Sequence, residues 1–248
     1  MKPILQVALD LLNADRALTI AQDAVSGGAD WLEAGTPLIK SEGMDIIRQL
    51  RDAFPDKTIV ADMKTMDTGA LETEMAAKAG ANVICLLAAA DDSTIGDAVK
   101  SARKYGVKLM VDLLGAPDLI KRAQVLETLG VDYLCIHVGI DEQMRGKKPK
   151  QVLASLYHHT GLPIAVAGGL NSETVAEMLQ GGASIIIVGG AITKAKNVTN
   201  AAALIKKAMM QKKSIKTDLF KKYDTPELRN AFQRVSTPNI SDAMHKQG

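Results

Sequence analysis

The sequence predicts an α/β protein: one (β/α)8 barrel of the TIM type over residues 1–212, followed by a short C-terminal extension over residues 213–248. Short apolar segments without internal alternation recur eight times, which is typical of strands buried on both faces of a parallel sheet. Amphipathic segments with helical spacing separate them. Eight such alternating units close more readily into a barrel than into an open sheet.

The expected strands are rich in Val, Ile and Leu. In chain order they are Ile4–Leu9, Trp31–Leu32, Thr58–Ala61, Val83–Leu87, Lys108–Val111, Tyr133–Ile136, Ile164–Ala167 and Ser184–Val188. Glycine precedes several of them, and it can adopt the left-handed conformation that ends a helix. The last expected helix is Thr199–Met210. The polar residues after it include Pro226 and Pro238 and predict a connector rather than a ninth unit.

The composition excludes several classes of protein. Thirty basic and 28 acidic residues give a net charge of +2, which argues against the broad basic surface of a dedicated nucleic-acid-binding protein. The chain shows neither an export leader nor an apolar stretch that could span a bilayer, so we expect a cytoplasmic protein without membrane segments. Cys85 and Cys135 fall within expected strands, away from metal-ligand spacing, and are expected to be unreactive reduced thiols.

Ionisable residues stand at the ends of five expected strands. They are Asp10, Glu33, Asp62 with Lys64, Asp112 and His137. A charged group at the end of a buried strand is costly unless it is paired or bound to a ligand. Barrels of this class carry their catalytic groups at the C-terminal ends of the strands. The sequence therefore predicts an active site at this end, the mouth of the barrel.

The densest cluster is the segment Asp62–Asp67. The two-residue period of a strand puts Asp62 and Lys64 on the same side, and Asp67 falls at the start of the next helix. A lysine between two carboxylates is held in its charged form. The alternative is that Asp67 only caps the helix and that Asp62 and Lys64 form an ordinary ion pair.

Glu33 and Asp62 are expected at neighbouring strand ends, where two carboxylates could bind Mg²⁺ together with water and substrate oxygens. The alternative is a pair between Glu33 and Lys64 without metal. His137 could donate or accept a proton near neutral pH. Alternatively, it is only hydrogen-bonded to Asp112 or Asp141.

Paired glycines follow the last two expected strands, Gly168 with Gly169 and Gly189 with Gly190. Glycine lets backbone N–H groups approach a phosphate closely, and barrels of this class bind phosphate after the seventh and eighth strands. One glycine pair alone also occurs in plain turns. Two pairs at these positions predict a phosphate site.

Four segments and the glycine pairs resemble the orotidine-monophosphate-decarboxylase superfamily. The segments are Val7–Asp10, Glu33–Pro37, Asp62–Asp67 and Ile136–His137. The specific part is the Asp-x-Lys-x-x-Asp motif of residues 62–67, and the resemblance covers residues 1–212. Within the superfamily the chain is most similar to the 3-hexulose-6-phosphate synthases. The related ketogulonate-phosphate decarboxylases carry an arginine-containing segment where Val138–Asp141 stands here, and Gly-Arg where Gly189–Gly190 stands.

This resemblance implies a reversible aldol condensation of formaldehyde with the sugar phosphate ribulose 5-phosphate, through a 1,2-enediolate. It assigns Mg²⁺ to Glu33 and Asp62, and proton transfer to His137. The further roles that it implies are positive charge from Lys64, orientation by Asp112 and Asp141, and sugar binding by Asp10 and Asp67. It also implies a homodimer, since the second aspartate of the motif commonly reaches the partner's site.

Two other functions stay open at this point. A ketogulonate-phosphate decarboxylase would use the same enediolate. A regulatory or RNA-associated protein could carry a vestigial barrel, although the intact Asp62, Lys64, Asp67 and His137 argue against it.

The tail carries a resemblance of its own. Residues 232–244 resemble the opening of the ribonuclease-activity-regulator family, of which only the first segment is present. We expect a chain cut after Lys213 to keep its activity, because every expected catalytic group precedes that point.

Overall fold

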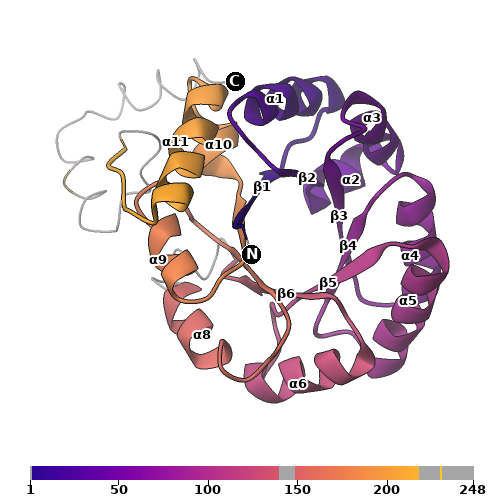
Figure 1. Cartoon of the computed structure of the whole chain (residues 1–248). Coiled ribbons are helices and arrows are strands. Elements are labelled where there is room, and N and C mark those ends of the chain that lie inside the picture. Colours follow the sequence, from indigo (N-terminus) through magenta and orange to yellow (C-terminus); the bar gives the residue numbers. More distant parts are fainter. Residues whose placement is uncertain (1, 140–148, 218–229, 231–248) are drawn as a thin grey trace.

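The fold is a closed parallel barrel surrounded by helices (Figure 1). The computed structural model describes residues 2–139, 149–217 and 230. Each strand pairs in parallel with the next in chain order, and β8 pairs with β1 to close the ring. The predicted (β/α)8 architecture is confirmed.

All eight predicted strands are present. Their bounds are β1 Ile4–Leu9, β2 Trp31–Ala34, β3 Thr58–Thr65, β4 Val83–Leu87, β5 Lys108–Asp112, β6 Tyr133–His137, β7 Ile164–Ala167 and β8 Ile185–Val188. The helices are α1 Ala14–Ser26, α2 Thr36–Glu42, α3 Asp45–Ala53, α4 Gly69–Lys78, α5 Asp92–Tyr105, α6 Leu119–Leu129, α8 Pro149–Leu156, α9 Val175–Gln180, α10 Gly190–Thr193 and α11 Val198–Gln211. Of the ionisable residues expected at strand ends, Asp112 and His137 are the last residues of β5 and β6, and Glu33 is the last but one of β2. Asp62 and Lys64 lie within β3, which continues to Thr65.

The alternation of side chains along each strand separates two apolar clusters. In β1, Leu5 and Val7 pack outward against the helices, whereas Ala8 belongs to the cluster inside the barrel. Cys85 and Cys135 lie in the inner cluster as free, buried thiols. Burial and then nearby carboxylates raise the pKa of both thiols well above the usual range, which agrees with the expected lack of reactivity.

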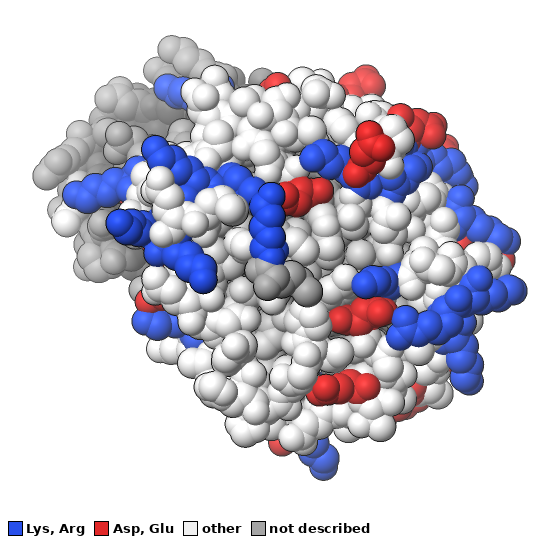
Figure 2. Space-filling view, in the orientation of Figure 1, with Lys and Arg blue, Asp and Glu red and all other residues white. Residues whose placement is uncertain are grey.

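Side-chain caps fix where several helices begin. Asn13, Asp91, Asp118 and Asn197 accept hydrogen bonds from backbone N–H groups in the first turns of α1, α5, α6 and α11. Within the part of the chain that the structure describes, no helix combines the length and apolar character needed to cross a membrane. On the face shown in Figure 2, acidic side chains lie among the basic ones, in keeping with the small net charge.

Candidate active site

A bulge in β3 shapes the centre of the site. The register between β3 and β4 shifts between Ala61 and Thr65, and Lys64 has a left-handed backbone with φ 49°. Such a conformation is strained for a residue with a side chain, and bulges next to active sites redirect side chains. Here the bulge brings Lys64 Nζ to 2.6 Å from Asp62 Oδ2. The predicted pair is confirmed, but a regular two-residue period is not what forms it.

The second partner of Lys64 differs from the prediction. Lys64 Nζ lies 3.6 Å from Asp112 Oδ2, whereas Asp67 is exposed and accepts a hydrogen bond from its neighbour's backbone, Thr68 N, at 2.7 Å. Within one chain the expectation that Lys64 lies between Asp62 and Asp67 is therefore wrong. Asp67 is not the N-cap residue of α4 either, since Thr68 holds that position.

The carboxylates around Lys64 decide its charge state. Burial lowers the pKa of Lys64, but the charge and hydrogen bond of Asp62 and the charge of Asp112 raise it by more. The pKa therefore lies above its ordinary value, and the side chain is a cation at neutral pH.

Glu33 is a buried carboxyl group held by one amide. Gln6, in β1, donates from Nε2 to Glu33 Oε2 at 2.5 Å. Burial, followed by the negative charges of Asp62 and Asp10, raises the pKa of Glu33 to about 8. Burial and the charge of Asp62 also raise the pKa of Asp10. The carboxyl groups of Glu33, Asp62 and Asp10, from β2, β3 and the end of β1, thus lie near enough for the charges of Asp62 and Asp10 to act on Glu33 and that of Asp62 on Asp10.

This crowding is what a divalent cation would relieve, since each carboxyl group disfavours ionisation of the others. Mg²⁺ suits one or two carboxylates completed by water and substrate oxygens. The described residues contain no group of three or more His, Cys, Asp or Glu that could hold a metal ion. Gln6 Oε1 is buried without a hydrogen-bond partner among them, and a bound ion or its water would satisfy such an atom.

The alternative to a metal, a pair between Glu33 and Lys64, is not formed. Glu33 bonds to Gln6, Lys64 bonds to Asp62 and Asp112, and no ion pair joins Glu33 to Lys64 in the described part of the chain. A further contact fixes the Asp62 side chain. Thr36 Oγ1, in the first turn of α2, lies 2.9 Å from Asp62 Oδ2 and 2.8 Å from Asp62 O. The chemistry of Glu33 and Asp62 therefore fits Mg²⁺.

His137 and Asp112 form the other half of the site. His137 Nδ1 lies 2.8 Å from Asp112 Oδ2, and Leu114 N donates to Asp112 Oδ1 at 2.9 Å. Burial raises the pKa of Asp112, but the hydrogen bond and charge of His137 lower it by more, so that it lies below its ordinary value. Asp112 is then an ionised acceptor and Nδ1 carries the hydrogen. The other ring nitrogen, Nε2, is the one that can accept a proton.

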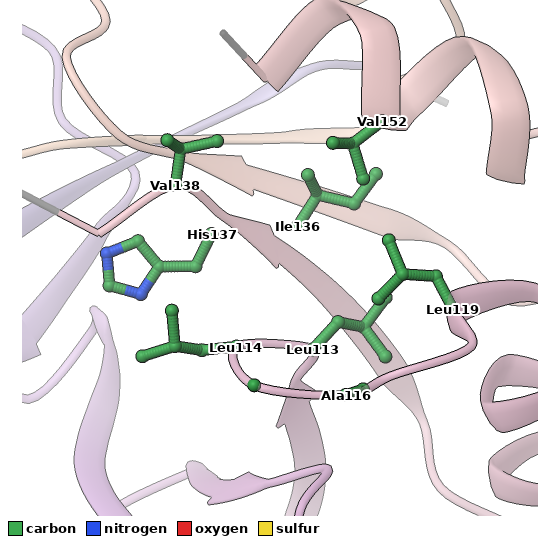
Figure 3. Close-up of a pocket in the computed structure, with 9 residues that line it drawn as sticks. Leu113, Leu114, Ala116, Leu119, Ile136, His137, Val138 and Val152 are labelled. Atoms are coloured by element: carbon green, nitrogen blue, oxygen red, sulfur yellow. The ribbon is translucent and has the colours of Figure 1, made fainter. Parts of the chain in front are cut away.

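A cavity of about 180 Å³, lined by several aliphatic side chains, adjoins His137 (Figure 3). The imidazole ring of His137 lies between Val138 and Leu114. Leu119 and Val152 lie on the opposite side of the cavity. Among the expected site residues that the structure describes, His137 is the one that lines this cavity. The cavity therefore lies beside His137 and the segment that follows Asp112.

The two glycine pairs meet at neighbouring strand ends, because β7 pairs with β8. Gly168 and Gly169 have φ of 113° and 67°, which residues with side chains rarely adopt. Gly190 begins the short helix α10. Lys194 lies close by, with Cδ 3.7 Å from the position that a Cβ on Gly190 would occupy, and its charge lowers the pKa of Asp10 against the larger effect of burial.

Sequence reasoning missed Gln6 and Thr36. Gln6 was detectable as a polar residue in an apolar strand, two positions from Ala8 and so also facing inward. Thr36 gave no such signal, since threonine near the start of a helix is common. Asp141 lies outside the described residues, so its expected role remains a prediction.

Comparisons with known proteins agree with this geometry. Residues 3–205 match the model of the orotidine 5'-phosphate decarboxylase / HUMPS family. The 3-hexulose-6-phosphate synthase of Mycobacterium gastri is 40% identical over 205 residues, which are 83% of this chain and 99% of that protein.

Two solved structures are similar as well. A crystal structure of 3-hexulose-6-phosphate synthase has a TM-score of 0.79 and 41% identity, covering 84% of this chain and 99% of its own. The 3-keto-L-gulonate-6-phosphate decarboxylase of Vibrio cholerae has a TM-score of 0.77 and 28% identity, with 85% and 99% covered.

Proposed function

We infer the function from one premise: the chain belongs to the orotidine 5'-phosphate decarboxylase / HUMPS family. It is a lyase, and its function is that of a 3-hexulose-6-phosphate synthase, which joins formaldehyde to ribulose 5-phosphate through a 1,2-enediolate. The observation that carries this conclusion is the match to synthases along almost their whole length. The residue roles below extend it as proposals.

His137 is the proposed proton acceptor. Forming the carbon nucleophile requires removal of the C1 proton beside the C2 carbonyl, and Nε2 is the ring nitrogen that can take it. Asp112 holds Nδ1–H at 2.8 Å and stabilises the positive charge that the ring then acquires. The Lys64 cation, paired with Asp62 and Asp112, supplies positive charge where negative charge develops on the substrate.

Glu33 and Asp62 would hold Mg²⁺ when it is bound. The ion would supply Lewis-acid stabilisation of negative charge on the substrate oxygens. Gln6 Nε2 holds Glu33 Oε2 at 2.5 Å, and Thr36 Oγ1 holds Asp62 Oδ2 at 2.9 Å, so each carboxylate is oriented by a hydrogen bond. Asp10, crowded by Asp62, would bind a sugar hydroxyl, which a carboxyl group can do as donor or acceptor.

The reaction tests the function directly. Purified protein with ribulose 5-phosphate should consume formaldehyde, and a chelator should stop it until Mg²⁺ is restored. The second candidate is the decarboxylase activity, favoured by the similarity to the solved decarboxylase structure. Release of carbon dioxide from 3-keto-L-gulonate 6-phosphate, without consumption of formaldehyde, would establish that candidate instead.

The glycine pairs of β7 and β8 are the proposed phosphate site. We expect Gly190→Asp to raise the KM for ribulose 5-phosphate at least about tenfold, because the new carboxylate would repel the phosphate. Gly190→Ala is the matched control, since its Cβ would meet Lys194 only at ordinary contact distance, 3.7 Å. Steady-state kinetics at saturating formaldehyde measure both. Equal KM values for the Asp and Ala variants would move the phosphate away from β8.

A homodimer is the proposed assembly. Leu71 and Met75 lie four residues apart on α4 and are 57% and 41% exposed, and Met66, in the loop before α4, is 50% exposed. Large apolar side chains gathered on one surface are typical of an interface. Asp67, which follows Met66 in the sequence, is also exposed, as a residue that reaches a partner's site would be.

We expect Leu71→Glu to produce a monomer that loses most of its activity, because a charge would enter the interface and Asp67 would lose its place in the partner's site. Light scattering after gel filtration gives the mass. Met210→Glu, at an equally exposed apolar residue of α11, serves as control. An active monomer would contradict a shared site.

The tail and the location remain predictions. The resemblance of residues 232–244 to the ribonuclease-activity-regulator family lies outside both the described residues and the family match over residues 3–205. A cytoplasmic location likewise remains a prediction. Family membership favours the enzyme over the RNA-associated alternative.

A further inference from the structure

The chain does not leave the barrel at the end of α11. Lys212 O accepts a hydrogen bond from Gln180 Nε2 at 3.1 Å, at the end of α9. Ile215 then bonds to Ser172, ahead of the start of α9, so the chain runs back along this helix. We call residues 213–217 the strap. Because helices in this fold run away from the mouth, the strap returns the chain to the mouth.

Three hydrogen bonds fasten the strap to the loop between β7 and α9. Ile215 N donates to Ser172 O at 3.0 Å, and Ser172 Oγ donates back to Ile215 O at 2.8 Å. Thr217 N donates to Glu173 Oε1 at 3.1 Å. Ser172 and Thr217 are only 1% and 6% exposed, and Ile215 packs against the outer apolar cluster. The hydrogen bonds and the burial together show that the strap is packed against the barrel, which a solvated linker would not be.

The fastened loop is the one that begins with Gly168 and Gly169. Both glycines have positive φ, and glycine loses more conformational freedom on ordering than any other residue. After them, Asn171 Oδ1 accepts from Glu173 N at 2.9 Å and Asn171 N donates to Thr174 Oγ1 at 3.0 Å, which makes a compact turn. Only Leu170 and Asn171 separate Gly169 from Ser172. Holding Ser172 therefore restricts the glycine backbone.

We propose that the strap is a positioning element for the sugar phosphate: Ile215 and Thr217 hold the β7–α9 loop so that the backbone of Gly168 and Gly169 is ordered before substrate binds. The proposal rests on the proposed function of this loop as a phosphate site. It also revises the expectation that the chain can be cut after Lys213 without consequence, because that cut removes both strap residues that bond to the loop.

The test begins with two substitutions in the full-length protein. Ser172→Ala removes the bond to Ile215 O, and Ile215→Pro removes the donor to Ser172 O. We expect each to raise the KM for ribulose 5-phosphate, up to about tenfold for Ile215→Pro, while kcat and the KM for formaldehyde change little. Amide hydrogen exchange over residues 168–174 should become faster. Ser26→Ala, which removes a similar serine bond to Gln22 O on α1, should change none of these.

Two shortened chains locate the effect. A chain ending at Lys213 should show the raised KM and faster exchange, whereas a chain ending at Thr217 should match the full-length protein. Equal KM values for the two shortened chains would overturn the proposal, and so would a lower melting temperature with unchanged KM and exchange. If the full-length protein consumed no formaldehyde, the proposed function itself would fail. The exchange measurements would then still decide whether the strap orders the loop.

Discussion

Asp62→Ala is expected to lower kcat at least about a hundredfold, as for the loss of a group that stabilises charge in the transition state. Asp62 makes the contacts on which the centre of the site depends. It pairs with Lys64 at 2.6 Å, is held by Thr36 at 2.9 Å, and with Glu33 forms the proposed metal site. Added Mg²⁺ should restore little activity, because Glu33 alone would hold the ion poorly.

Metal binding and folding are measured on the same variant. Mg²⁺ should raise the melting temperature of the unsubstituted protein and leave that of the Asp62→Ala variant unchanged, because an ion stabilises only the state that binds it. Asp56→Ala, at an exposed position before β3, controls for the loss of a carboxylate. A folded Asp62→Ala protein with near-normal activity would show the metal assignment to be wrong.

His137→Ala is expected to lower kcat by about 10²- to 10⁴-fold, the usual contribution of a general base. The step that fails should be removal of the C1 proton. Exchange of that proton with deuterated water, followed by NMR in ribulose 5-phosphate without formaldehyde, isolates this step. We expect the exchange to fall as far as the overall reaction.

Two further variants separate the ring from its support. Asp112→Asn keeps the imidazole but removes the charge that fixes its tautomer, so we expect a smaller loss of exchange than for His137→Ala. His158→Ala, at an exposed histidine after α8, should have no effect. If His137→Ala stopped condensation while exchange continued, His137 would act on formaldehyde rather than on the C1 proton.

The strands could be predicted because each strand of a parallel barrel is buried on both faces and therefore appears in the sequence as one continuous apolar segment. Prediction of which strand carries Glu33 and which carries His137 needed the apolar run of one strand only, and both positions are confirmed. Prediction failed at Lys64, whose partner depends on the bulge in β3 and on Asp112 two strands away. A two-residue period cannot anticipate a residue with φ of 49°.

The remaining misses have a common cause. Gln6 in β1 bonds to Glu33 in β2, and Thr36 in α2 bonds to Asp62 in β3. Such partners are set by tertiary packing that no local pattern encodes. The strap could not be predicted from composition, since Lys213 and Lys216, with Lys212 just before them, suggest a solvated linker. Its bonds to Ser172 and Glu173 run mainly through backbone groups, which every residue carries.

The seam between β1 and β8 sets when a growing chain can first function. Residues 4–7 pair with residues 185–188, so the ring closes only after nearly all of the barrel has left the ribosome. Asp10 and Gly189 meet at this seam, with Asp10 Oδ2 3.5 Å from the position that a Cβ on Gly189 would occupy. A nascent chain that stops before β8 carries Glu33, Asp62 and Lys64 but lacks this side of the site. During synthesis the charged groups are therefore present first, and the substrate site is complete only once β8 has paired with β1.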